Sequence, residues 1–328
     1  MEVSLKNKVN IKEQLIKFQS LIALLLMVFL MSFLSDKFMS VDNLWNVMRQ
    51  ISVNVCISVG MTLVILTAGI DLSVGSILAF SGAVGAGLLQ NGIAIPSLGI
   101  FVGFTLLGAI IAALVAGGVL GLVNGVAVTR FNVQPFVATL AMLTIARGLT
   151  MLWTGGFPIT GLGANFSFIG TGWFLDIPMP VWISIVIVAL FMLVLRKTRF
   201  GRYIYAIGGN EKAAGLSGIN VNKIKLLVYV LAGVLAAVGG LILTARLNSA
   251  QPNAGMGFEL DSIAAVVIGG TSLFGGRGSI IGTVQGALII GVLNNGLVLL
   301  NVSPFWQQVI KGLVILLAVI IDRSEKND

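Results

Sequence analysis

The sequence predicts an all-α, polytopic membrane protein with about ten transmembrane helices, some of them broken or re-entrant. Of the 328 residues, 57% are hydrophobic and only 10% are charged, whereas soluble domains carry about 25% charged residues. Apolar stretches of about 20 residues, the length that crosses a bilayer core, recur along the chain. A transmembrane β-barrel would need short strands that alternate apolar and polar residues, and these stretches are continuously apolar.

The N-terminal segment is polar and basic, with Lys6, Lys8, Lys12 and Lys17, and an apolar stretch follows it. A cleaved signal peptide begins in a similar way, but it ends in a small-residue cleavage site that does not follow here. We therefore expect an uncleaved first span, preceded by a cytoplasmic segment at residues 1–19.

Candidate spans then follow one another to the end of the chain. They cover residues 20–35, 44–69, 72–91, 97–128, 132–154, 180–196, 223–246, 261–275, 278–300 and 304–321. The fourth is overlong, and we expect Gly117 and Gly118 to break it. The third and the eighth are short and rich in glycine. Three polar connections, 155–179, 197–222 and 247–260, separate the spans most clearly.

The orientation of the spans follows from the Lys and Arg residues of the connections. The region 196–225 carries one acid, Glu211, and a run of basic residues: Arg196, Lys197, Arg199, Arg202, Lys212, Lys223 and Lys225. The connections 155–179 and 247–260 contain no Lys or Arg. Both termini and the basic loop are therefore expected in the cytoplasm, and an even number of spans satisfies this arrangement.

A carboxylate interrupts the apolar pattern between the second and third spans, in "LTAGIDLSVGS". Two interpretations are open. Asp71 or Ser73 caps the helix that runs from Leu72, where a carboxylate is favoured at the positive helix end. Alternatively, this turn lies at membrane depth and lines a polar path, since an acid near the bilayer centre costs about 3 kcal/mol on insertion scales unless it has a partner or water.

A similar pattern recurs late in the chain. "VVIGGTSLFGGRGSIIGTVQGALIIG" resembles "VILTAGIDLSVGSILAFSGAVGAGLL", with matching Gly-Ser-Ile anchors at 75–77 and 278–280. The match is either an internal repeat or a chance echo of low-complexity membrane sequence. If it is a repeat, two broken-helix elements face one another. Topology places Asp71 and Arg277 on the same side, each at the start of a helix, so we hypothesise that they form a charge pair or share one polar cluster near a cytoplasmic gate that includes Ser73. The late segment lacks the G-K-[ST] of a P-loop, so no nucleotide site is expected in this chain.

The basic loop contains "GRYIYAIGGNEKAAGLSGINVNKIK". Asn210 is expected to cap a short amphipathic helix that has Glu211 in its first turn and ends at Gly215 and Gly218. Such a helix is suited to docking into a groove of a partner protein. The alternative is a positive-inside loop that rests on lipid headgroups.

Residue counts exclude several other functions. Cys56 is the only cysteine, so no intrachain disulfide is possible, and the chain has no histidine. Zinc sites of the common type and histidine-based acid–base catalysis are therefore excluded, and no metal site is expected. The net charge of +8 lies at the ends of spans, which indicates the surface of the lipid bilayer rather than a nucleic acid as its partner.

Four stretches together resemble the membrane-spanning permease subunit of bacterial ABC importers for ribose and related monosaccharides. They are "AGIDLSVGS", the basic-loop segment quoted above, "NSAQPNAGMGFELDSIAAVVIGGTSLFGG" and "GSIIGTVQGALIIGVLNNG", and the resemblance covers about residues 18–322. It implies a single permease domain at 20–322 with a cytoplasmic coupling loop at about 197–223 and a cytoplasmic tail at 323–328. The family's coupling core maps onto Glu211, Ala213, Ala214, Gly218 and Ile219.

The resemblance also implies the partners and the location. The chain would form a permease dimer, expected to be a homodimer, in the bacterial plasma (inner) membrane. Two cytoplasmic ATPase subunits would bind ATP and magnesium, and an extracytoplasmic binding protein would deliver the sugar. The permease itself would carry no catalytic residues.

A path for a neutral sugar needs hydroxyls and amides, because each sugar hydroxyl requires a partner when it is desolvated. The candidates within the spans are Asn54, Asn124, Gln134, Thr271, Ser272, Asn294 and Asn295. Hydrogen bonds between packed helices explain such residues equally well. Arg147 is expected near the outer end of the fifth span, where it snorkels. On the outer face, Gln251, Asn253 and Glu259 are the candidates for docking the binding protein.

Other transport functions remain open at this point. The same family transports other small substrates, such as xylose, galactose or autoinducer-type sugars, and the sequence does not distinguish them. An ion-coupled secondary transporter would need a titratable group near the midplane, for which Asp71 is the main candidate. An intramembrane enzyme would need a nucleophile and a base, and no convincing base is present.

Overall fold

The computed structural model describes residues 19–95 and 99–324, which form thirteen helices and six short strands. The predicted cytoplasmic segment lies outside these residues except for Gln19, and so does most of the predicted tail. The helices are α2 (Gln19–Leu34), α3 (Val41–Leu66), α4 (Val74–Asn91), α5 (Leu106–Thr129), α6 (Pro135–Thr154), α7 (Ala164–Thr171), α8 (Met179–Lys197), α9 (Arg199–Gly209), α10 (Glu211–Leu216), α11 (Val221–Leu247), α12 (Phe258–Ile268), α13 (Ile280–Leu299) and α14 (Pro304–Ser324).

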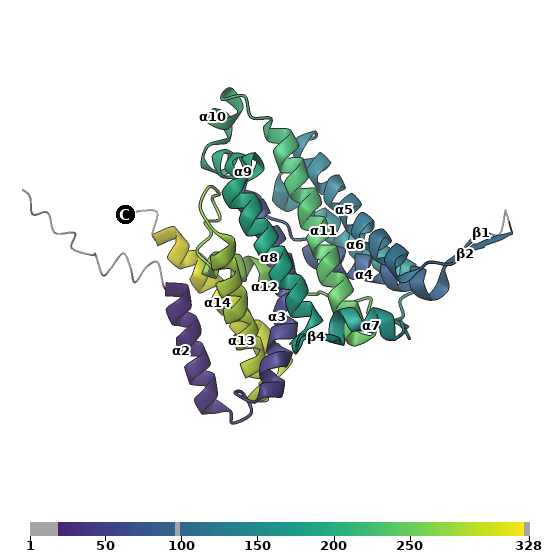
Figure 1. Ribbon diagram of the computed structural model, residues 1–328. Coiled ribbons are helices and arrows are strands. Elements are labelled where there is room, and N and C mark those ends of the chain that lie inside the picture. Colours follow the sequence, from purple (N-terminus) through teal and green to yellow (C-terminus); the bar gives the residue numbers. More distant parts are fainter. Residues whose placement is uncertain (1–18, 96–98, 325–328) are drawn as a thin grey trace, which may run out of the picture.

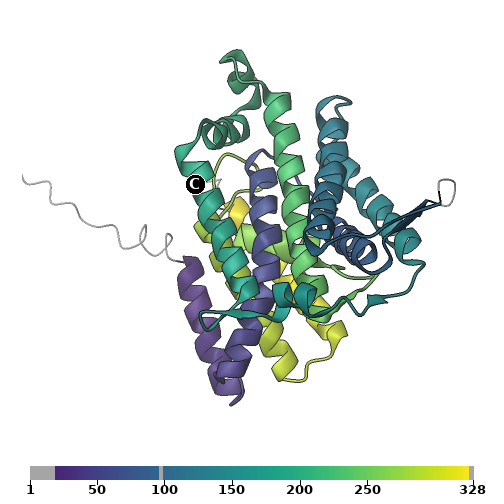
Figure 2. The same ribbon diagram turned by 45° about the vertical axis from the view of Figure 1, so that its right-hand side comes forward.

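The strands form three small antiparallel pairs in the connections. They are β1 (Ile93–Ile95) with β2 (Ile100–Val102), β3 (Ile159–Thr160) with β6 (Ser249–Ala250), and β4 (Trp173–Phe174) with β5 (Ile177–Pro178). The first pair projects from the helices as a hairpin (Figures 1 and 2). All the long elements are therefore helical, as expected for a chain that must satisfy its backbone hydrogen bonds inside a bilayer.

Helices α3 and α11 form the centre of the bundle. Every residue of α3 from Ile51 to Leu66 is buried, and α11 packs against α3, α4 and α5. Helices α4, α5 and α6 lie on one side of this centre, and α2, α12, α13 and α14 lie on the other (Figure 1). The outer helices expose apolar stripes instead, such as Leu107, Ile111 and Val115 on α5. A helix with an apolar stripe on its outward face is suited to contact with lipid.

Each predicted span contains a helix, but the helices differ in length. Within the described residues, seven helices are long and apolar enough to cross a membrane: α3, α4, α5, α6, α8, α11 and α13. Helix α2 and the apolar part of α14 are shorter. Helix α12 has only 11 residues, a length of about 16 Å at 1.5 Å per residue. The eighth span, predicted at 261–275, is therefore only partly helical: α12 ends at Ile268, and a loop at 269–279 follows.

The fourth span is not broken at Gly117 and Gly118, so that expectation was wrong. Helix α5 runs without interruption from Leu106 to Thr129, and Ile100–Val102, at the start of the predicted span, form strand β2 instead. The glycines instead allow α5 to pack closely against α11. A Cβ added at Gly117 would lie 2.5 Å from the carbonyl oxygen of Gly233, and one at Gly121 would overlap the carbonyl of Tyr229. Small residues let two membrane helices approach at backbone distance.

Candidate gate and coupling site

The break between α3 and α4 places a buried carboxylate among polar side chains. Asp71 Oδ1 accepts hydrogen bonds from Ser73 N at 2.9 Å and from Ser73 Oγ at 2.5 Å. Helix α4 begins at Val74, directly after Ser73, and the Ser73 side chain makes no capping hydrogen bond. Asp71 therefore fixes the turn before the helix rather than capping the helix itself, which corrects the first of the two interpretations.

Three neighbouring helices supply polar groups to this break. Asn124 Nδ2 on α5 donates to Ser73 Oγ at 2.9 Å, and Thr139 Oγ1 on α6 donates to the carbonyl of Ile70 at 3.2 Å. The Tyr229 hydroxyl on α11 lies so close to Gly69 that a Cβ there would come within 2.7 Å of it. Among the described residues, Asp71 Oδ2 and the Tyr229 hydroxyl are buried without a hydrogen-bond partner.

We call Asp71, Ser73, Asn124, Thr139 and Tyr229 the gate cluster. Its hydroxyls, amide and carboxylate are the groups that hydrogen-bond water or a neutral polyol. Sequence analysis identified the first three residues and missed Thr139 and Tyr229. A hydroxyl inside an apolar stretch was the available signal, but it is common in membrane helices and does not point to a particular cluster.

The expected ion pair between Asp71 and Arg277 is absent. The two ion pairs within the described chain join Lys225 to Glu211 and Lys311 to Asp261, and Arg277 is exposed whereas Asp71 is buried. The two breaks nevertheless meet through their backbones, since Gly276 N donates to the carbonyl of Leu66 at 3.0 Å. Gly275 and Gly276 have φ values of 84° and 73°, which glycine adopts readily. Backbone contact therefore replaces the expected charge pair.

Helix α9 ends directly on this meeting point. A Cβ added at Gly208 would overlap both the carbonyl oxygen of Leu66 and the backbone nitrogen of Gly276. Only a residue without a side chain fits between the α3–α4 break and the 269–279 loop. We call the contact of Gly208, Leu66 and Gly276 the three-way junction. It brings the basic loop into contact with both breaks.

The short helix expected after α9 is confirmed. Asn210 caps α10 by accepting a hydrogen bond from Ala213 N at 3.0 Å, and the chain turns at Gly218 with a φ of 84°. Glu211 pairs with Lys225 on α11 at 2.6 Å. Leu216 is 92% exposed at the end of the helix, where it forms an apolar protrusion on a polar surface.

The remaining path candidates occupy different environments. Asn294 Nδ2 on α13 donates to Asp261 Oδ2 at 3.3 Å, and Lys311 on α14 pairs with the same oxygen at 3.0 Å. Asn295 and Asn43 exchange two amide hydrogen bonds at 2.9 and 3.0 Å. These two candidates therefore hold helices together. Sequence analysis missed the Asp261–Lys311 pair. Each of these charged residues lies in an apolar segment, and a hydropathy pattern does not show that the two segments meet.

The other four candidates are spread along the bundle. Asn54 is buried within α3, and Gln134 is the exposed residue before α6. Thr271 and Ser272 lie in the loop after α12, where Ser272 N donates to the carbonyl of Arg277 at 3.0 Å. Thr271 is fully buried against Gly278, since a Cβ at 278 would overlap the Thr271 side chain. These two residues shape the loop that reaches the three-way junction.

Arg147 does not snorkel, contrary to expectation. Its Nη1 donates to the carbonyls of Pro252 at 2.7 Å and Ala254 at 2.8 Å, so α6 holds the 248–257 loop in place. Glu259 is partly buried, and a Cβ on Gly75 would come within 2.5 Å of its carboxylate. Glu259 thus packs against the start of α4 instead of standing free on a docking surface. Gln251 and Asn253 are exposed, as a docking role requires.

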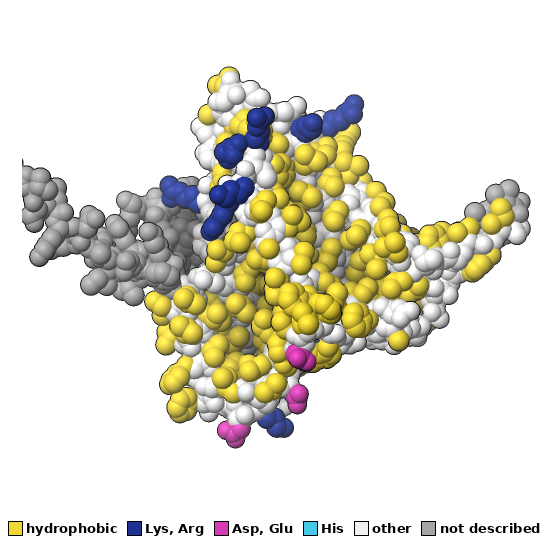
Figure 3. All heavy atoms as spheres, in the orientation of Figure 1, with side chains coloured by type: hydrophobic (Ala, Val, Ile, Leu, Met, Phe, Trp, Pro, Cys, Tyr) yellow, Lys and Arg dark blue, Asp and Glu magenta, His cyan; other side chains and the backbone are white. Residues whose placement is uncertain are grey.

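Charged side chains separate along the long axis of the bundle. Lys and Arg gather at the end that carries α9 and α10, and Asp and Glu appear at the opposite end of the face in Figure 3, where some basic atoms also lie. Apolar side chains fill the band between the two ends. This distribution is the one that a bilayer-spanning protein presents to lipid and to the two aqueous phases.

The fold and the arrangement of helix breaks define a multi-pass membrane transporter subunit. A family model described as "Branched-chain amino acid transport system / permease component" matches residues 43–319, and the chain belongs to this permease family. It is 52% identical to the ribose import permease protein RbsC of Escherichia coli K12 over 96% of both chains. It is 50% identical to RbsC of Bacillus subtilis, over 93% of this chain and 92% of the relative. Identity to the D-allose transport system permease protein AlsC of E. coli is 40%, over 88% of this chain and 85% of the relative. No solved structure matches the chain.

Proposed function

We propose that this chain is the permease subunit of an ATP-driven importer for ribose or a similar monosaccharide in the bacterial plasma membrane. It works as a homodimer with its termini and the α9–α10 loop in the cytoplasm. A partner ABC ATPase binds ATP and magnesium, and an extracytoplasmic binding protein delivers sugar to the face that carries Gln251 and Asn253. The observation that carries the proposal is the three-way junction, which links an exposed docking helix to two broken helices.

The choice of substrate rests on the relatives and on the gate cluster. Ribose permeases from three different genera match at 50–52% identity, and permeases for allose, xylose and galactose match at 36–40%. A branched-chain amino acid is the second candidate, because the family description names that substrate. The gate cluster offers hydroxyls, one amide and one carboxylate, which suit the hydroxyls of a neutral sugar better than an apolar side chain.

The junction supplies the mechanism. ATP binding closes the ATPase subunits and moves α10. Helix α9 transmits this movement to the backbones of Leu66 and Gly276. Because these backbones touch, the α3–α4 break and the 269–279 loop shift together. The gate cluster then opens to one side of the membrane at a time, as alternating access requires.

Uptake in cells tests the proposal. A bacterium without its own ribose permease would express this chain with the ATPase and binding protein encoded beside it. We expect uptake of labelled ribose that excess unlabelled ribose suppresses more strongly than allose, xylose or galactose. Uptake of leucine without uptake of any sugar would establish the second candidate and overturn the first.

The charge of Glu211 should matter for coupling. Glu211→Lys places two lysines together, because it removes the 2.6 Å pair with Lys225 that ties α10 to α11. We expect uptake to fall by about tenfold while the amount of inserted permease stays unchanged, since coupling free energies are typically 1–3 kcal/mol. Lys212→Ala changes an exposed charge on the same helix and is the control. Equal uptake and equal ATP hydrolysis by the two variants would contradict a coupling role.

The carboxylate of Asp71 should matter for transport more than for folding. Asp71→Asn keeps an oxygen that accepts from Ser73 N, so the turn before α4 persists, but an amide replaces the carboxyl group. We expect about tenfold lower uptake with normal assembly. Asp36→Asn, at an exposed position, serves as the control. If Asp71→Asn transports like the control, Asp71 is a turn residue only.

A further inference from the structure

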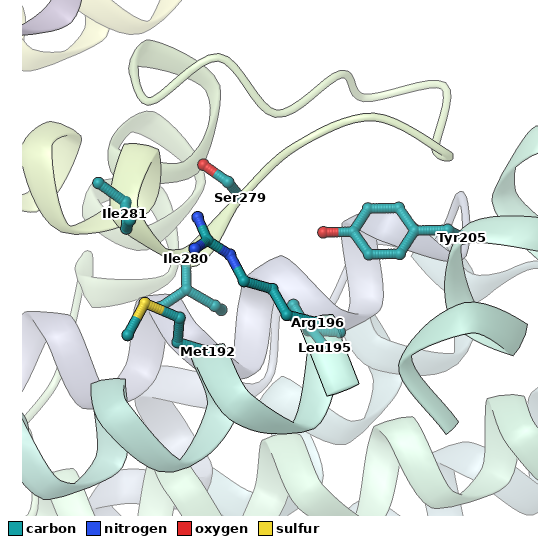
Figure 4. Close-up of a pocket in the computed structure, with 7 residues that line it drawn as sticks. All are labelled: Met192, Leu195, Arg196, Tyr205, Ser279, Ile280 and Ile281. Atoms are coloured by element: carbon teal, nitrogen blue, oxygen red, sulfur yellow. The ribbon is translucent and has the colours of Figure 1, made fainter. Parts of the chain in front are cut away.

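A small pocket with a mixed polar and apolar lining lies where α8, α9 and α13 meet. It has a volume of about 20 Å³, and its lining includes Met192, Arg196, Tyr205 and Ser279. In Figure 4 the Arg196 guanidinium points toward Ser279, and the Tyr205 ring enters from the opposite side. The end of α8 and helix α9 contribute to the lining of the pocket, and they lie at the end of the bundle where Lys and Arg gather (Figure 3). The pocket therefore lies at the level where lipid headgroups meet the protein.

The pocket offers positive charge that no acid of the surrounding segments neutralises. Residues 196–210 and 269–282 contain no Asp or Glu, and neither ion pair of the described chain involves Arg196. Ser279 Oγ accepts from Gly282 N at 3.1 Å and so caps α13. The start of a helix leaves further N–H groups without intrahelical partners, which favours an anion there. An arginine beside such a helix start matches phosphate geometry well.

Tyr205 closes the other side of the pocket. Its hydroxyl donates to the carbonyl of Gly278 at 2.9 Å, directly before the α13 cap. Burial raises the pKa of the Tyr205 hydroxyl, and the nearby Arg196 opposes this effect. The tyrosine therefore stays neutral and leaves the positive charge of Arg196 available to a ligand.

An apolar groove continues from the pocket along the bundle. It has a volume of about 370 Å³ and runs between α3, α8 and α13, with Ile51, Val55, Val188 and Leu288 in its walls. Met192 lines both the pocket and the groove, so the two are adjoining. Along α8 the groove extends from Met192 to Val181, about 16 Å at 1.5 Å per residue. The groove therefore runs along most of α8, from near its basic end almost to Met179 at the other end.

We infer that this composite site binds one anionic phospholipid, with its phosphate at Arg196 and the start of α13 and one acyl chain in the groove. A free phosphate would leave the apolar groove unfilled, and a zwitterionic lipid would bring its own cation to a surface that is already basic. Basic pockets between membrane helices bind anionic headgroups in this way. The bound lipid would tie α8 to α13 beside the 269–279 loop, and so stabilise the loop that reaches the three-way junction. The inference does not depend on which substrate is transported.

Lipid binding to the purified protein in detergent tests the inference. Phosphatidylglycerol is expected to raise the melting temperature and to remain bound in native mass spectrometry, whereas phosphatidylcholine and inorganic phosphate are expected to do neither. Equal effects of phosphatidylglycerol and phosphatidylcholine would overturn the anionic preference. An equal effect of inorganic phosphate would show that the site is an anion site without a lipid chain. These comparisons use the unaltered protein, so they stand even if a variant fails to fold.

Two variants locate the site. Arg196→Ala should weaken phosphatidylglycerol binding about fivefold, the effect of one cation near an anionic lipid, whereas Lys212→Ala on the same basic surface should leave it unchanged. Ala189→Trp fills the groove at a lining position and should weaken binding while leaving Arg196 in place. If Arg196→Ala and Lys212→Ala bind alike, the headgroup assignment is wrong. If Ala189→Trp binds as tightly as the unaltered protein, the acyl chain does not lie in the groove.

Discussion

Replacing Gly208 with alanine is expected to abolish most uptake while the permease still inserts and α10 still folds. The added methyl would overlap the Leu66 carbonyl and the Gly276 nitrogen, so α9 would have to move away from both breaks. Forcing an extra methyl into a packed contact costs about 1–3 kcal/mol, and here the displaced contact is the one that transmits movement. We expect at least about a tenfold loss of uptake, within the usual range of coupling free energies.

The neighbouring residue provides a matched control. A Cβ added at Gly209 would have no atom within 4 Å, and Gly209 also belongs to α9. Gly209→Ala should therefore transport like the unaltered permease. Uptake and ATP hydrolysis would be measured together. If the junction is broken, we expect the partner ATPase still to hydrolyse ATP while uptake is lost. Equal uptake by Gly208→Ala and Gly209→Ala would remove the three-way junction from the mechanism.

The second large effect is expected on stability, at the contact between α5 and α11. A Cβ added at Gly233 would overlap the carbonyl of Gly117, so Gly233→Ala must separate two helices that touch through their backbones. We expect the free energy of unfolding to fall by about 1–3 kcal/mol, with less protein recovered from the membrane.

Gly148→Ala on α6 is the control for the helix contact, since a Cβ there meets no atom within 4 Å. Both variants gain helix propensity equally, so a difference between them reports packing. Thermal unfolding in detergent would be the measurement. If Gly233→Ala is as stable as Gly148→Ala, the close approach of α5 and α11 does not limit stability.

Much of the fold was predictable, because the length of an apolar segment and the charge of a loop can be read from neighbouring residues in the sequence. Each candidate span contains a helix, and the capped helix at 211–216 follows from Asn210 and Gly218. The failures concern residues whose role depends on which helix lies opposite. Gly117 looked like a helix breaker because its partner Gly233 is distant in the sequence. The end of α12 was missed because the loop after it remains partly apolar.

The gate region was predictable in composition but not in pairing. The match between the two glycine-bracketed segments indicated that they meet, and their backbones do meet at Leu66 and Gly276. The same reasoning paired Asp71 with Arg277, yet the carboxylate faces Ser73 and the arginine is exposed. Hydropathy and charge place a residue along the membrane normal, but its rotation about the helix axis and its partners depend on packing. The partners of Arg147 and Lys311, the Pro252 carbonyl and Asp261, could not be predicted for the same reason.

Energy dependence of uptake in reconstituted vesicles tests the central claim most directly. The purified permease, with its partner ATPase and binding protein, would be placed in vesicles and offered labelled ribose under defined energy sources. The account predicts uptake that requires ATP, the ATPase and the binding protein, and that persists when proton and sodium gradients are dissipated. Ribose uptake by the permease alone, driven by either gradient in the absence of ATP, would contradict it.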